Sequence, residues 1–155
     1  MMHIKNGKFV FDHTVIQEEP ASHLKDLWFR ENACVRVYAH WLETLQDASL
    51  VARADWCRSA HALNAEKLHA RIVRLGDDVH LIDSWRALGS IKDLLATSFG
   101  ADLAVADLRV MERDLLEEYM AKLMSFDGQN LDLLQHELLP VQAECAQAWE
   151  QGSDS

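Results

Sequence analysis

Residues 27–42 read LWFRENACVRVYAHWL, and they place an acidic side chain on the apolar side of a helix. On a helical wheel, at ~100° per residue, the apolar positions form one arc with Glu31 at its middle. That arc consists of Leu24, Leu27, Trp28, Cys34, Val35, Tyr38, Leu42 and Leu45. An unpaired charge is costly in an apolar interior. The stretch therefore predicts a packed helix and, inside the core, a group that compensates Glu31.

The same pattern occurs a second time. Residues 108–123 repeat the spacing of residues 27–42, and in both a Glu is followed seven positions later by a Tyr (Glu31 and Tyr38, then Glu112 and Tyr119). A second pair of segments, residues 63–70 and 141–148, also matches. It aligns Leu63, Glu66, His69 and Ala70 with Val141, Glu144, Gln147 and Ala148. The chain thus repeats a two-helix pattern, which favours two helical hairpins packed together.

The periodicity predicts an all-α fold, an antiparallel four-helix bundle with a short extra helix in the connection between the second and third helices. Residues 1–22 are expected to be an irregular extension, with Asn6-Gly7 typical of a tight hairpin. The bundle occupies residues 23–150 and residues 151–155 form a disordered tail. The expected helices cover residues 23–45, 50–75, 82–98, 101–124 and 131–149, and Pro140 is expected to kink the last one or to mark a local restart.

Composition narrows the classes of function. The 155 residues carry a net charge of −10, which disfavours nucleic acid as a partner. No apolar run approaches the ~18 residues of a membrane span, and the N-terminal residues lack a signal-peptide core. The three cysteines have no paired spacing and indicate reduced thiols in a cytoplasmic protein. Cys34 and Cys57 are interpreted as small core residues, and the six histidines other than His69 and His136, His61 among them, as incidental.

The wheel also turns Glu66, His69, Glu112 and Glu144 toward the interior. Carboxylates that meet at one level repel one another unless protons or a cation join them, and a divalent metal ion is an economical solution. Three alternatives remain open. Glu66 and His69 can be a surface pair on a helix edge, Arg58 can pair with Glu31, and Glu137 can be another ligand on the last helix.

With these residues the chain resembles the ferritin-like superfamily, of the rubrerythrin and bacterioferritin type. Residues 85–98 and 110–119 also look like a group of bacterial ferritin-like proteins with an added helix before the third bundle helix. The resemblance implies a carboxylate site for iron, as one ion or a di-iron pair, or for manganese. Such a site reacts with dioxygen or peroxide as a ferroxidase or peroxidase. Its implied ligand positions are Glu31, Glu66, His69, Glu112, Glu144 and Gln147.

Within that implied site, Glu31 and Glu112 are terminal or chelating ligands, Glu66 and Glu144 bridge, and His69 binds one metal. Gln147 departs from the family pattern, which has His at this position, and a neutral amide oxygen is a weaker ligand for ferrous iron. That departure favours a second hypothesis, a metal-free bundle that acts through a surface or by dimerising. A third is a binder of hydrophobic ligands between the helices. The expected partners are a metal ion and further copies of the chain, as a homodimer or higher homo-oligomer.

Overall fold

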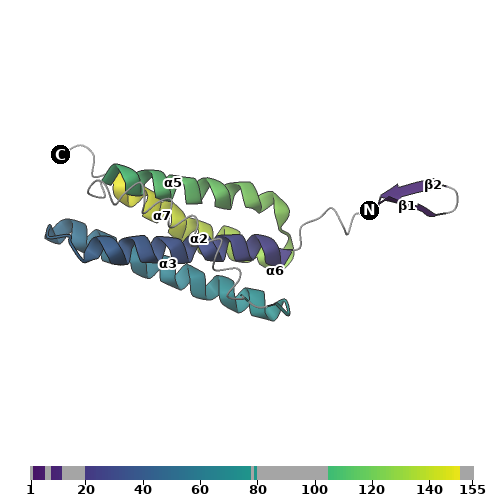
Figure 1. Ribbon diagram of the computed structural model, residues 1–155, viewed down its shortest axis with the longest axis horizontal. Coiled ribbons are helices and arrows are strands. Elements are labelled where there is room, and N and C mark those ends of the chain that lie inside the picture. The colour runs from purple at the N-terminus through teal and green to yellow at the C-terminus, as the bar shows by residue number, and fades with distance from the viewer. Residues whose placement is uncertain (1, 6–7, 12–19, 78, 80–104, 151–155) are drawn as a thin grey trace.

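The computed structural model describes residues 2–5, 8–11, 20–77, 79 and 105–150. Four helical rods in this part of the chain form an all-helical bundle, as predicted (Figure 1). The rods are α2 (Pro20–Leu42), α3 (Ala48–Arg74), α5 (Val105–Lys122) and a composite rod of α6 (Gly128–Asp132), the π-helical segment η2 (Leu133–Leu138) and α7 (Leu139–Glu150). A 3-10 turn, η1 (Leu123–Ser125), follows α5.

A small hairpin precedes the bundle in the sequence. Strands β1 (Met2–Lys5) and β2 (Lys8–Phe11) pair antiparallel, with Met2 opposite Phe11 and Lys5 opposite Lys8. This pairing brackets residues 6–7, in agreement with the hairpin expected there.

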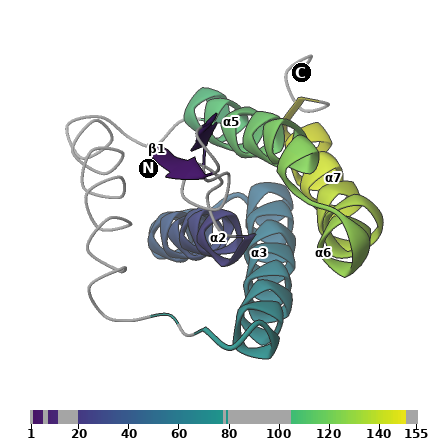
Figure 2. The same cartoon turned by 90° about the vertical axis from the view of Figure 1, so that its right-hand side faces the viewer.

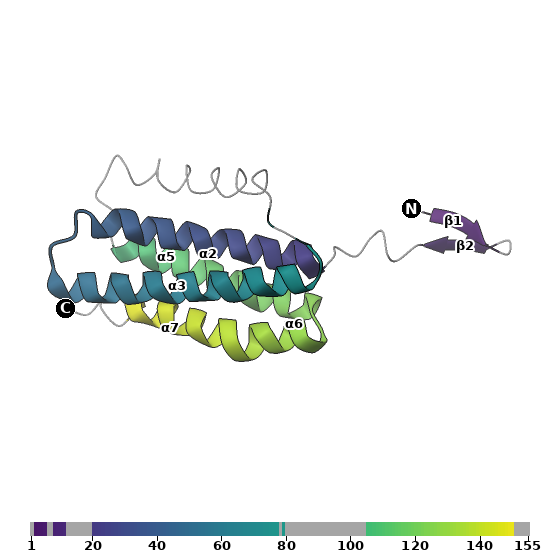
Figure 3. The same cartoon turned by 90° about the horizontal axis from the view of Figure 1, so that it is seen from below.

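The rods are arranged as two antiparallel hairpins. The α2–α3 pair lies beside the pair formed by α5 and α7, as the end view in Figure 2 and the view from below in Figure 3 both show. In Figure 1 the colour gradient shows α3 and α5 running in the same direction. Consequently α3 ends and α5 begins at opposite ends of the bundle. The helix predicted for residues 82–98 and the tail at 151–155 lie outside the described residues.

Local chemistry explains where the helices begin. Pro20 is the first residue of α2, where its missing N–H costs nothing, so the helix starts earlier than residue 23. Asp47 is the N-cap of α3, and its side chain accepts hydrogen bonds from the backbone N–H groups of Ser49 and Leu50 at 2.9 and 3.0 Å.

Pro140 marks a restart in the last rod, as predicted. The residues just before it form the π-helical segment η2, and the Leu139 N–H donates to the Leu134 carbonyl oxygen, five residues earlier. Proline cannot donate the usual helical hydrogen bond, and the wider π turn re-phases the backbone before α7 begins. The rod therefore continues past Pro140, with Pro140 in the first turn of α7.

The core consists of two apolar clusters with a polar layer between them. One cluster includes Leu24, Leu68, Leu115 and Leu134. The other includes Val37, Ala54, Cys57, Leu108 and Trp149. Both contain side chains from α2, α3, α5 and the last rod, so each cluster ties together the two hairpins. No helix in the described ranges is both long enough and apolar enough to cross a membrane.

Replacing Leu68 by alanine tests this core. Leu68 is completely buried, whereas Leu63 on the same helix is 49% exposed. We expect Leu68→Ala to lower the free energy of unfolding by about 2–5 kcal/mol, because it leaves a cavity. Leu63→Ala, the matched control, should change it by less than about 0.5 kcal/mol. Urea denaturation followed by circular dichroism measures both, and equal effects would contradict this assignment of the core.

Candidate metal and proton site in the bundle interior

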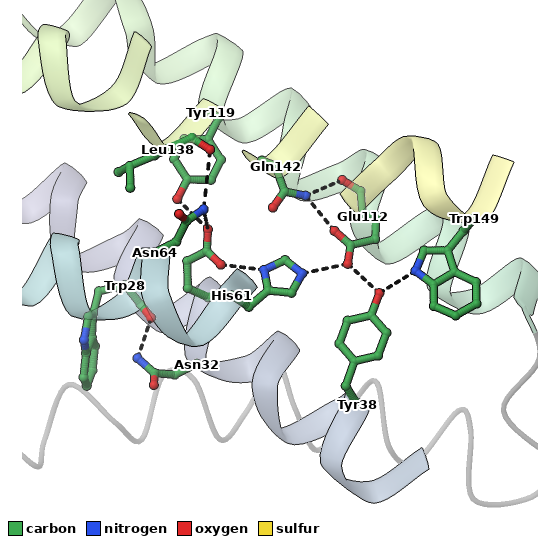
Figure 4. Close-up of polar contacts among 11 residues, drawn as sticks. Trp28, Asn32, Tyr38, His61, Asn64, Glu112, Tyr119, Leu138, Gln142 and Trp149 are labelled. Atoms are coloured by element: carbon green, nitrogen blue, oxygen red, sulfur yellow. Dashed lines mark hydrogen bonds and ion pairs between the residues drawn. The ribbon is translucent and has the colours of Figure 1, made fainter. Parts of the chain in front are cut away.

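A histidine lies between two carboxylates in the middle of the bundle. Glu31 on α2, His61 on α3 and Glu112 on α5 are all 0% exposed. His61 Nδ1 is 2.6 Å from Glu31 Oε2. His61 Nε2 is 2.7 Å from Glu112 Oε1, a contact drawn in Figure 4. One imidazole ring therefore contacts both carboxylates, one with each nitrogen.

The charges around His61 decide its protonation state. Burial alone lowers the pKa of His61, but the nearby negative charges of Glu112 and Glu31 outweigh it and raise the pKa to about 10. At neutral pH the ring is thus an imidazolium, and both of its N–H groups donate to carboxylates. The positive charge that compensates Glu31 and Glu112 in the metal-free protein is the imidazolium of His61.

Two further donors hold each carboxylate. Tyr119 Oη donates to Glu31 Oε1 at 2.6 Å, and Asn64 Nδ2 donates to the same oxygen at 3.3 Å. Glu31 therefore accepts from a tyrosine of the other hairpin, since Tyr119 is on α5 and Glu31 is on α2.

Glu112 has the corresponding set. Tyr38 Oη donates to Glu112 Oε1 at 2.5 Å, and Gln142 Nε2 donates to Glu112 Oε2 at 2.7 Å. The indole N–H of Trp149 donates in turn to Tyr38 Oη at 2.7 Å. Burial and the charge of Glu112 raise the pKa of the Tyr38 phenol, so it stays protonated and acts as a donor. All four carboxylate oxygens of the two glutamates have a protein donor.

Two buried amide oxygens in the same network lack a hydrogen-bond donor. Among the described residues, Asn64 Oδ1 and Gln142 Oε1 have no hydrogen-bond donor, although the side chains are only 1% and 0% exposed. Turning either amide over would not help, because its nitrogen already donates to two oxygens. Asn64 donates to Glu31 and the Leu138 carbonyl, and Gln142 donates to the carboxylate and carbonyl of Glu112. These oxygens are available to accept from a water molecule or to bind a cation.

A group of sulfur and oxygen atoms lies next to this network. The Sγ atoms of Cys57 and Cys145 and a carboxylate oxygen of Glu112 all lie within 4.8 Å of one another, and all three residues are buried. A hydrogen bond between the thiols of Cys145 and Cys57 lowers the pKa of Cys57 and, together with burial, raises that of Cys145. Cys57 and His61 are one helical turn apart on α3, so both face the same interior. This group can hold a metal ion.

The six predicted ligand positions have different outcomes. Glu31 and Glu112 are buried at one level and share His61, as the predicted interior carboxylates should. The prediction that Glu66, His69 and Glu144 face the interior is wrong, because all three are exposed. Gln147, the sixth ligand position that the resemblance implied, is also exposed. His69 instead lies near the Trp28 ring, with ring centres 6.4 Å apart.

The error has a simple geometric origin. His69 lies about 80° and Glu66 about 140° around α3 from His61, at ~100° per residue. The buried face of α3 is the one that carries Ala54, Cys57, His61, Asn64, Ala65, Leu68 and Ile72. The members of this stripe recur in steps of three and four residues. That spacing indicates that His61 is buried, whereas the sequence interpretation treats His61 as incidental.

The two remaining candidates from the sequence, Arg58 and Glu137, both lie outside the interior site. Arg58 is not the partner of Glu31, since its side chain is 42% exposed and pairs with Asp55 at 3.2 Å. Glu137 is exposed and pairs with Lys67 at 3.5 Å. The compensating charge inside the bundle therefore comes from an imidazolium and not from a guanidinium.

Comparison with known proteins adds no assignment: no protein-family model matches the chain, and neither curated proteins nor solved structures give a significant match.

Raising the pH should weaken the metal-free protein through His61. Its folded-state pKa of about 10 lies above the ordinary value of 6.5, so its contribution to stability is full below about pH 6.5 and is lost as the pH rises through 10. We expect the free energy of unfolding to fall over this window, and His61→Gln to reduce the slope. Denaturant titrations at several pH values measure it. His136→Gln, at an exposed histidine, should keep the wild-type slope; an unchanged slope in His61→Gln would contradict the assignment.

The two tyrosines should differ in their effect on stability. Tyr119→Phe removes one hydrogen bond to a buried carboxylate, which costs about 1.5–3 kcal/mol. Tyr38→Phe removes the equivalent bond and also leaves the Trp149 indole N–H without its acceptor, so it should cost more. Chemical denaturation of the two single variants tests the order, and a larger loss for Tyr119→Phe would contradict the role given to Tyr38.

Proposed function

We propose that this protein binds one divalent transition-metal ion inside the bundle, through Cys57, Cys145, Glu112 and His61. The observation that carries the proposal is the convergence of the Cys57, Cys145 and Glu112 donor atoms within 4.8 Å in a fully buried position. His61 Nε2 lies 2.7 Å from Glu112 Oε1 and adds a nitrogen donor beside this group. Thiolate, carboxylate and imidazole groups are all ligand types that zinc takes, and they also suit ferrous iron.

The neighbouring side chains support the same site. A histidine that binds a metal through one ring nitrogen usually donates its other N–H to a carboxylate, which fixes the ring. Glu31 occupies this orienting position, 2.6 Å from His61 Nδ1. Tyr38 and Gln142 hold Glu112 in the same way. Binding would release the protons that the thiols and the ring carry in the metal-free protein.

The two-metal carboxylate centre implied by the ferritin-like resemblance fits less well. Its bridging positions, Glu66 and Glu144, are exposed, and the thiolates favour zinc or ferrous iron over manganese. The repeated Glu and Tyr on α2 and α5 support a distant relationship to ferritin-like bundles in which the ligands come from other positions. If iron is the resident ion, its reaction with dioxygen or peroxide belongs to this one-metal position.

A second candidate function is a metal-free bundle that acts by association. It is favoured by the complete set of donors on the oxygens of Glu31 and Glu112, which satisfies both carboxylates without a metal. The two candidates differ in one measurable property, the amount of metal that the purified protein binds.

Metal binding is tested with Zn²⁺ and Fe²⁺ added separately to chelator-treated protein, the iron under anaerobic conditions. We expect about one ion per chain, with affinity reduced about tenfold or more in Cys57→Ser and Cys145→Ser because each loses a ligand. Equilibrium dialysis followed by elemental analysis gives both numbers.

Two controls make the result specific. Cys34→Ser changes a buried cysteine outside the donor group and should bind like the wild type. The combined change of Glu66, His69, Glu144 and Gln147 to alanine should also keep the metal. Loss of metal only in this combined variant would support the ferritin-like ligand set instead, and no binding by the wild type would leave the metal-free candidate.

A further inference from the structure

Two of the three cysteines lie next to each other although they are far apart in the sequence. Cys57 on α3 and Cys145 on α7 are both free and buried, and their Sγ atoms lie within 4.8 Å. The third cysteine, Cys34 on α2, is also buried but is not a member of this group. The juxtaposition therefore singles out one cysteine pair that bridges the two helical hairpins.

We propose that Cys57 and Cys145 form a reversible disulfide when a hydroperoxide oxidises them, and that the disulfide closes the metal site. The thiol half of this proposal stands on the distance between the two sulfur atoms alone, and only the effect on metal rests on the function proposed above. A disulfide needs an S–S distance of about 2.05 Å, which two side chains in contact can reach when their sulfur atoms turn toward each other.

The chemistry balances with a hydroperoxide as the two-electron oxidant. One cysteine sulfur attacks the peroxide, breaks the O–O bond, becomes a sulfenic acid and releases an alcohol, or water from hydrogen peroxide. The second sulfur then attacks the sulfenic sulfur, the S–S bond forms and water leaves. In total, two thiols and one hydroperoxide give one disulfide, one alcohol and one water. From the metal-bound dithiolate, two protons enter from solvent and the ion is released, because a disulfide sulfur is a poor ligand.

Access to the buried pair comes from the same motion that a metal ion needs. The donor group is enclosed, so the bundle has to open locally before either an ion or a peroxide reaches it. The last rod is suited to this, because the π-helical segment η2 and Pro140 interrupt the regular α-helical hydrogen bonding just before α7. The proposal requires that a local opening of α7 expose Cys145 while α2 and α3 stay folded.

The thiol half is tested on metal-free protein. Chelator-treated wild type is exposed to hydrogen peroxide, the remaining thiols are alkylated, and the intact mass and the linked peptides are determined. We expect a mass lower by about 2 Da before alkylation, one alkylated cysteine after it, and a peptide pair joining residues 57 and 145, all reversed by dithiothreitol. Cys34→Ser should give the same linked pair, whereas Cys57→Ser and Cys145→Ser should give none. Oxidation to sulfinic acid, a link through Cys34, or three unreacted thiols would overturn the proposal.

The metal half is tested on zinc-loaded protein with a chromogenic zinc chelator present. Peroxide should release zinc at the rate at which the linked peptide pair appears, and dithiothreitol should restore binding. Disulfide formation with zinc still bound would overturn the effect on metal. A protein that never takes up zinc but forms the disulfide would refute the proposed function while supporting the dithiol, so the two failures are distinguishable.

Discussion

The interior of this bundle depends on one imidazolium held between two carboxylates. Glu31, His61 and Glu112 come from three different helices, and the Gln142 side chain brings in the fourth rod through its hydrogen bond to Glu112. Burying such groups is expensive, and their mutual attraction roughly repays the cost only when the geometry is good and the remaining oxygens have donors. The layer therefore specifies the register of the helices more than it adds net stability. If the helices slip relative to one another, a charge is left without a partner in the core.

The network has an approximate two-fold pattern that His61 breaks. Each glutamate accepts from a tyrosine of the opposite hairpin and from a side-chain amide of its own hairpin, Asn64 in the first and Gln142 in the second. These amides occupy equivalent positions in the two repeats recognised in the sequence. A strictly symmetric interior would hold two carboxylates and two equal central residues. The position that corresponds to His61 is instead Leu139, so a single positive charge serves both sides.

The sequence predicted the inward-facing residues correctly on the helices where apolar and polar side chains lie on clearly separate sides. Glu31 and Glu112 interrupt rows of large apolar residues, so their inward direction is visible on a wheel. On α3 the contrast is poor, because alanines occur on several sides and Trp56 and Leu63 are exposed. The apolar direction was misjudged there by about 80°, which moved the predicted ligands from His61 to His69. In the last rod the π-helical segment shifts the phase, and a constant angle per residue cannot follow it. The alignment of the two repeats agrees with the structure, but the buried amides Asn64 and Gln142 lie two residues before the glutamates that were chosen.

The same protonation that completes the fold also sets the strength of any metal site here. In a zinc finger the ligands are unsatisfied without metal, so binding and folding are one event. In this bundle the carboxylate oxygens already have donors, and the imidazolium of His61 has a pKa of about 10. A metal ion has to displace at least one proton of His61 and part of the hydrogen-bond network. Only the binding free energy that remains after this cost appears as affinity. An interior whose carboxylates already have donors without an ion is thus suited to exchangeable metal occupancy. A metal that serves only to hold the helices together would have little to add.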